Sequence, residues 1–227
     1  MSLQPVLDYL TALEQNNDRD WYHAHKPQLT EAQRAFEEFL QELLLEIRRF
    51  DSSIPLLDPR ALTFKLNRDT RFSHDKSPYN PAFRAHIAAG GKLPVPVGYY
   101  VFLRPGGRSF LGGGLFADMF PAATTLVRDH IAAHGEQWQA LLDAPNFSGH
   151  FTLGGTALKK VPQGYDPAHP QANYLRYKSW YVEYPLEDGA LLQKGFVSSA
   201  AGIFHHMQPF NAFLNQALEG FQMPARP

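Results

Sequence analysis

The chain has 227 residues, of which 44% are hydrophobic and 13% aromatic, so we expect a folded protein with a sizeable core. It contains no Cys, which excludes disulfides, thiolate nucleophiles and cysteine-built metal sites. The formal net charge of −1 disfavours a protein that coats nucleic acid through a broad basic face. The first residues lack the basic region of a signal peptide, and no apolar run approaches the roughly 20 residues of a membrane span. We therefore expect a cytoplasmic protein with no membrane partner.

The first 55 residues are predicted to be helical. Three leucines between positions 7 and 13 fit one helical face, and the turn at 16–18 offers capping side chains for a short second helix. A longer third helix is predicted because apolar residues recur at spacings of three and four between positions 32 and 47. A proline-bearing loop at 52–59 follows this helix.

From residue 61 the apolar residues recur with a period of two, which indicates strands. Gly and Pro residues at 90–96 and 104–107 predict hairpins, and hairpins join antiparallel strands. The predicted strands are 61–67, 83–89, 97–104, 108–113 and 178–184. Helices are predicted again at 118–133, 135–143 and 190–221.

This order of elements predicts an α+β fold, with an antiparallel sheet of about five or more strands flanked by N-terminal and C-terminal helices. We expect a single domain over 1–227, because no linker, repeat or low-complexity tract divides the chain. The domain would be helical in 1–55, mainly strands in 61–115 and mixed in 116–227.

Positive charge is concentrated in residues 61–110, which contain eight Lys or Arg and two Asp and are therefore net +6. The rest of the chain is net −7. Charge separated in this way attracts anions to one region of an otherwise acidic protein. The stretch therefore predicts a site for a small anionic ligand.

Guanidinium groups bind phosphate and carboxylate groups through paired hydrogen bonds, so this stretch supplies suitable donors. Asp69 and Asp75 are predicted to orient the cations, and Asp69 is the candidate general base if the site is catalytic. The predicted anion-binding residues are Lys65, Asn67, Arg68, Arg71, Lys76 and Arg84, and the predicted pocket walls are Tyr79, Tyr99 and Tyr100. Prolines at 78 and 81 are expected to stiffen this loop.

Two other interpretations of these residues stay open. In the first, the chain is a structural or partner-binding protein whose charges form only an internal ion-pair network, with Asp75 bound to Arg68 and Asp69 bound to Lys65 or Arg71. A buried unpaired charge would be costly. In the second, the stretch is a nucleic-acid-binding module. The bases of the bound nucleic acid would stack on Phe72, Tyr79, Tyr99 and Tyr100.

Other chemistry finds less support in the sequence. Gly112–Gly114 followed by a helix near Asp118 could hold a phosphate, although glycines at the end of a strand more often mark close packing. The histidines lack metal-ligand spacing, and the chain has no nucleophile elbow or cofactor fingerprint, so we predict no metal and no cofactor. The sequence therefore assigns no reaction and leaves open whether the protein is an enzyme.

Residues 67–79 read Asn-Arg-Asp-Thr-Arg-Phe-Ser-His-Asp-Lys-Ser-Pro-Tyr, which resembles the signature of the widespread, mostly bacterial domain-of-unknown-function family 2461. The stretches 16–22, 26–27 and 111–115 are also similar to that family, whereas 116–118 departs from its usual Trp-Met-Pro. The resemblance covers nearly the whole chain. It implies the family's fold and a cytosolic protein, and it implies no reaction.

Overall fold

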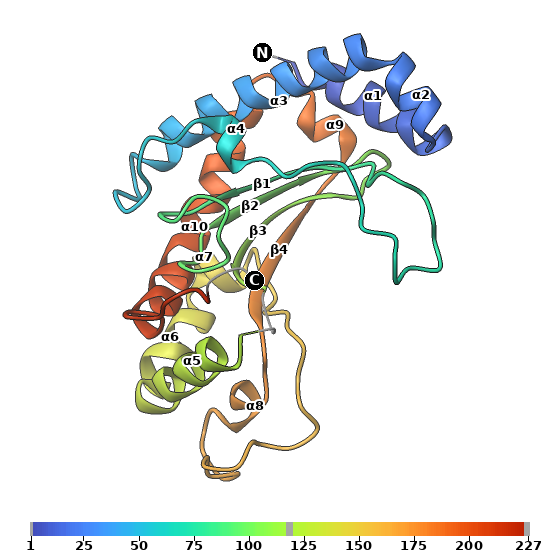
Figure 1. Cartoon of the computed structure of the whole chain (residues 1–227). Coiled ribbons are helices and arrows are strands. Elements are labelled where there is room, and N and C mark those ends of the chain that lie inside the picture. Colours follow the sequence, from blue (N-terminus) through green and yellow to red (C-terminus); the bar gives the residue numbers. More distant parts are fainter. Residues whose placement is uncertain (1, 117–119, 225–227) are drawn as a thin grey trace.

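The fold is described from a computed structural model for residues 2–116 and 120–224 (Figure 1). The helices are α1 (Gln4–Gln15), α2 (Arg19–Ala24), α3 (Lys26–Ile47), α4 (Pro59–Leu62), α5 (Pro121–Ala133), α6 (Gly135–Asp143), α7 (Pro145–Ser148), α8 (Ala172–Leu175), α9 (Asp188–Leu191) and α10 (Phe196–Ala217). The strands are β1 (Phe83–Ile87), β2 (Tyr99–Leu103), β3 (Ser109–Leu115) and β4 (Trp180–Leu186). The protein is therefore α+β, as predicted.

The N-terminal helices form because apolar residues recur at helical spacing. α1 and α3 pack against each other, and α3 also packs against α10. The predicted cap at 16–18 is confirmed, since the Asp18 carboxylate accepts a hydrogen bond of 2.8 Å from the Trp21 amide at the start of α2. The neighbouring Asn17 makes two hydrogen bonds to the backbone of Tyr79.

The four strands pair in the order β1-β2-β3-β4, and every neighbouring pair is antiparallel. The prediction of a further strand at 61–67 was wrong. Asp58 caps a single helical turn, α4, and residues 63–67 then make only isolated bridges: Thr63 pairs with Ala85, and Asn67 with Tyr79. The segment alternates apolar and polar residues like a strand, but it runs beside β1 without forming a continuous ladder.

Figure 1 shows α3 and α10 on the same side of the sheet. The strand residues on that face, such as Val101, Leu111 and Val182, are fully buried. α10 approaches β3 so closely that a Cβ on Gly113 would lie 3.1 Å from Asn211 Oδ1 and Met207 Sδ. Gly112–Gly114 lies within β3, so close packing explains why these positions are glycines. Asp118, near which the phosphate-binding helix was predicted, lies outside the described residues.

The opposite face of the sheet (the open face) displays aromatic side chains from three strands. Tyr100 and Phe102 of β2, Phe110 of β3 and Tyr181 of β4 are half-buried, and Phe116 beyond β3 is exposed. Their ring centroids lie 4.6 to 6.1 Å from neighbouring rings, which makes a continuous aromatic surface. Strand alternation explains it, because successive side chains point to opposite faces.

The remaining helix predictions are largely confirmed. α6 has the predicted bounds, and α5 begins at Pro121, with positions 118–119 of the prediction outside the described residues. The helical region predicted at 190–221 is α10, preceded by the short α9. Among the described helices, none combines the length and apolar character needed to cross a membrane.

Candidate functional site

A cavity of about 430 Å³ lies beside β1 and is called the β1 cavity. Its walls come from α3, α4, the 63–67 segment, the start of β1 and Lys92 in the β1–β2 connection. Three of the six predicted anion-binding residues, Lys65, Asn67 and Arg84, line it. Residues 63–67, which were predicted to belong to a strand, therefore form one wall of the cavity.

Four cations line the β1 cavity, and one of them is neutralised by a carboxylate. Glu37 on α3 accepts a hydrogen bond of 3.0 Å from Arg60 Nε. Arg84 Nη2 and Lys92 Nζ instead donate to backbone carbonyls of the 63–67 segment, at 3.0 and 3.1 Å. A carbonyl holds a cation in place without cancelling its charge.

Lys65, Arg84 and Lys92 have no carboxylate within ion-pair distance anywhere in residues 2–116 and 120–224. Within the same residues, Nε of Arg84 is buried and makes no hydrogen bond. The Lys65 and Lys92 side chains are exposed, so an ion from solvent can reach them. The β1 cavity therefore contains surplus positive charge that an anion can reach.

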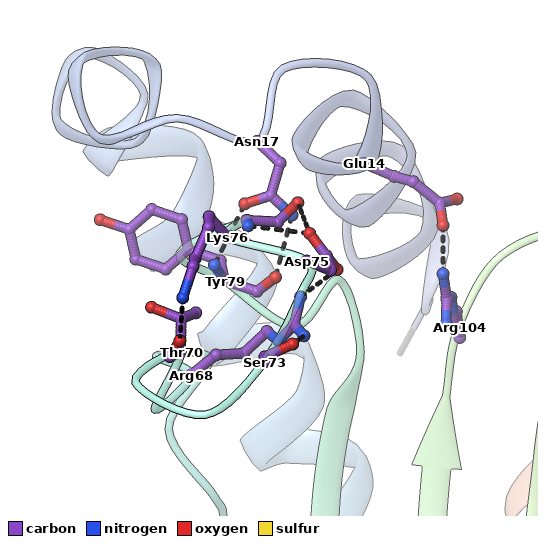
Figure 2. Close-up of polar contacts among 10 residues, drawn as sticks. Glu14, Asn17, Arg68, Thr70, Ser73, Asp75, Lys76, Tyr79 and Arg104 are labelled. Atoms are coloured by element: carbon purple, nitrogen blue, oxygen red, sulfur yellow. Dashed lines mark hydrogen bonds and ion pairs between the residues drawn. The ribbon is translucent and has the colours of Figure 1, made fainter.

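The other three predicted anion-binding residues, Arg68, Arg71 and Lys76, belong to residues 68–78 (the signature loop). Both predicted ion pairs are present there: Arg68 binds Asp75, and Arg71 Nη2 lies 2.6 Å from Asp69 Oδ2. Figure 2 shows Asp75 facing Arg68 beneath the turn that follows α1. The two carboxylates of the loop are therefore both engaged by its arginines.

Hydrogen bonding keeps the loop carboxylates ionised. The hydroxyl of Ser77, followed by Arg68, lowers the pKa of Asp75, and the Arg71 guanidinium lowers the pKa of Asp69 to about 2. The Asp69–Arg71 pair is exposed, with 56% and 78% of the two side chains accessible. Asp69 is thus a weak base bound to a cation, and its predicted role as general base finds no support in this geometry.

Lys76 and Tyr79 are held by backbone contacts. Lys76 Nζ donates a hydrogen bond of 3.0 Å to the carbonyl of Thr70, as Figure 2 shows. Asn17 donates to the carbonyl of Tyr79 at 2.9 Å and accepts from its amide at 3.1 Å. The Tyr79 ring stacks on Tyr22, with centroids 4.0 Å apart. These contacts fix both sides of the loop to its own backbone and to the N-terminal helices.

A second cavity, of about 400 Å³, is lined by Arg68 and Asp75 of the loop and by Arg104 at the end of β2. Glu14 of α1 also lines it and binds both Arg104 and Arg108, the latter at 2.9 Å from Nη1. Arg108, followed by Arg104, lowers the pKa of Glu14 to about 2. Two arginines and two carboxylates line this cavity, so its charges balance.

The three tyrosines predicted as pocket walls lie in different places. Tyr79 lines the second cavity, Tyr100 lies on the open face, and Tyr99 is fully buried under the helices. The Tyr99 hydroxyl donates a hydrogen bond of 2.7 Å to Asp51. Phe72, in contrast, is 94% exposed at the tip of the signature loop. The proposed base-stacking residues therefore do not form one surface.

His86 follows Arg84 by two positions on β1 and is 7% exposed. Burial lowers its pKa to about 4, against hydrogen bonds to the backbone of Leu93 and Gly91 that raise it. His86 is consequently neutral at pH 7. The positive charge near the cavity therefore comes from Lys and Arg side chains.

Sequence reasoning missed Lys92, Glu37 and Glu14. Lys92 belongs to the basic stretch, but it was placed in a hairpin connection with no predicted contact to residue 63. Glu14 and Glu37 lie on helices, 90 and 23 residues from the arginines that they neutralise. No local sequence pattern predicts ion pairs between residues so far apart. Within the described residues, no group of three or more His, Asp or Glu side chains is arranged to hold a metal ion.

The fold and site define an α+β protein with a surplus-cation cavity beside the edge strand of a four-stranded antiparallel sheet. The chain belongs to the family described as conserved hypothetical protein (DUF2461), whose sequence model matches residues 5–213. The predicted family membership is therefore confirmed over most of the chain. Neither the curated proteins nor the solved structures contain a significant match to this chain.

Proposed function

We propose that the protein binds a small phosphate- or carboxylate-bearing ligand in the β1 cavity. One observation supports this above the others: Lys65, Arg84 and Lys92 have no carboxylate partner among the described residues. An anion would supply the missing negative charge and accept hydrogen bonds from the ammonium and guanidinium groups that line the cavity. Asn67 adds an amide group to the same wall.

The size of the cavity supports a small molecule. Ligand cavities commonly enclose roughly 300–1,000 Å³, and the β1 cavity encloses about 430 Å³. Its lining also includes the buried rings of Phe36 and Phe83, beside polar side chains such as Gln33.

The signature loop is assigned a structural role. Its arginines are neutralised by its own aspartates, and Lys76 is held by a backbone carbonyl. The loop packs on Asn17 and connects the 63–67 wall of the cavity to β1. The ion-pair interpretation therefore describes the loop, whereas the anion interpretation describes the cavity.

Isothermal titration calorimetry with orthophosphate, ribose 5-phosphate and citrate tests the proposal. Replacing Arg84 by Met removes the guanidinium and keeps most of the apolar stem. We expect Arg84→Met to weaken binding by about tenfold or more, since hydrogen bonds to charged groups contribute roughly 1.5–3 kcal/mol. Lys92→Met gives a second variant whose exposed position makes misfolding a minor concern.

Arg71→Met is the matched control, because it removes the same group from the signature loop. It should leave the affinity for each probe within about twofold, since Debye screening weakens distant exposed charges. Absence of binding heat with all three probes would refute the proposed site. An equal loss of affinity in Arg71→Met and Arg84→Met would assign the effect to overall charge and not to the β1 cavity.

A further inference from the structure

Phe64 joins the β1 cavity to the aromatic open face of the sheet. Its ring lines the cavity and lies 6.2 Å from the ring of Tyr100. Tyr100 in turn lies 6.1 Å from Phe110 and 5.6 Å from Phe116. The surplus cations and a partly accessible aromatic surface are therefore adjacent.

Arg84 contacts both parts of this surface. Its Cζ lies 5.5 Å from the centroid of the Phe64 ring, and its guanidinium hydrogen-bonds to the 63–67 backbone. Register also places Arg84 and Tyr100 on the same face of neighbouring strands. A planar guanidinium held beside aromatic rings can bind an anion at its edge and stack against a planar ring at its face.

We propose that the ligand of the β1 cavity is a nucleoside monophosphate, with its phosphate at Lys65, Arg84 and Lys92 and its base stacked on the Phe64–Tyr100 surface. This inference rests on the proposed function and specifies its ligand class. A phosphate alone satisfies the cations and leaves the aromatic surface in water. A planar base satisfies both features, because every base has a face that stacks on aromatic side chains.

The same wall also gives a reason for selectivity. The half-buried rings of Phe64 and Tyr100 offer apolar area that a sugar phosphate without a base cannot cover. The base contributes only if its ring reaches these side chains, so the affinity difference between a nucleotide and its sugar phosphate measures the contact directly. Stacking of one base strengthens binding by about tenfold or more.

Calorimetry on the wild-type protein with AMP, ribose 5-phosphate and adenosine is the first test. We expect AMP to bind about tenfold more tightly than ribose 5-phosphate, and adenosine to bind more weakly than AMP because it lacks the anion. Equal affinities for AMP and ribose 5-phosphate would overturn the nucleotide inference and leave the anion site intact. Absence of binding by both would overturn the anion site as well.

Variants then locate the base. Tyr100→Leu and Phe64→Leu should each lower the affinity for AMP more than the affinity for ribose 5-phosphate, so that the two affinities approach each other. Tyr181→Leu, at the far strand of the same face, is the matched control and should change neither affinity. Unchanged AMP affinity in both Tyr100→Leu and Phe64→Leu, or an equal loss in Tyr181→Leu, would overturn the assignment. The comparison of AMP with ribose 5-phosphate on the wild type needs no variant, so a misfolded variant does not remove the test.

Discussion

The signature loop and the β1 cavity both contain cations of the basic stretch 61–110, but of these two regions only in the loop do carboxylates among the described residues neutralise cations of that stretch. In the loop, Asp69 and Asp75 each bind an arginine. In the cavity, Glu37 binds Arg60 alone. A cation count along the sequence therefore does not locate an anion site; the position of each neutralising acid does.

The largest expected difference between the two regions is their response to acid. Because His86 of β1 has a folded pKa of about 4, below the usual value of about 6.5, its neutral form is favoured by folding. This preference stabilises the folded state fully above about pH 6.5. As the pH falls towards 4, the free energy of unfolding decreases by on the order of 3 kcal/mol. The loop carboxylates, whose folded pKa values are lowered, add a slope only below about pH 5, where the unfolded aspartates begin to bind protons.

Urea unfolding of the wild type and His86→Gln between pH 4 and pH 7 measures this contribution. The wild-type free energy of unfolding should fall with pH more steeply than that of the variant. His130 and His206, whose pKa values burial also lowers, remain in both proteins and cancel in the comparison. Parallel pH dependences would contradict the buried neutral state of His86.

A smaller effect is expected where the signature loop meets the N-terminal helices. Asn17→Ala removes both hydrogen bonds to the Tyr79 backbone and should lower the free energy of unfolding by about 2 kcal/mol, at about 1 kcal/mol for each bond. Chemical denaturation measures it. Asn16→Ala is the control, since the Asn16 side chain bonds only to Ala12 of its own helix among described contacts. Equal losses in the two variants would assign the effect to the helix end.

The smallest effect is expected within the loop itself. Arg71→Ala removes an exposed ion pair, and such pairs contribute little because water and salt screen them. The thermal unfolding midpoint should therefore stay within experimental error of the wild type. A clear decrease, absent in the equally exposed Arg34→Ala, would show that the Asp69–Arg71 pair organises the loop more strongly than its exposure suggests.

The elements with the clearest periodicity could be predicted from sequence. Apolar residues recur at helical spacing in α3 and at every second position in β2, because each element buries one face. The positions of both elements therefore follow from the hydrophobic pattern. The 63–67 segment shows the same alternation, yet it makes only isolated bridges to its neighbours. Alternation describes which side chains are buried, and it does not reveal whether a neighbouring backbone completes the ladder.

The site was predictable only where partners are close in sequence. Arg68 and Asp75 are seven residues apart, and Arg71 and Asp69 two, so local geometry indicates both pairs. Glu14 reaches Arg104 across 90 residues, which only the tertiary fold brings together. Acids that lie far away in the sequence therefore also neutralise cations of the basic stretch, and counting only Asp69 and Asp75 missed them.

The broken pairing beside β1 also bears on aggregation. β1 is an edge strand, and an edge with a regular row of free backbone groups invites another chain to add a strand. Here the 63–67 segment occupies part of that edge: Thr63 pairs with Ala85, and the Phe64 amide donates to the Arg84 carbonyl. Because the segment then turns away towards the signature loop, it offers an incoming strand no continuous template. The irregularity that forms the cavity wall thus also protects the sheet from edge-to-edge association.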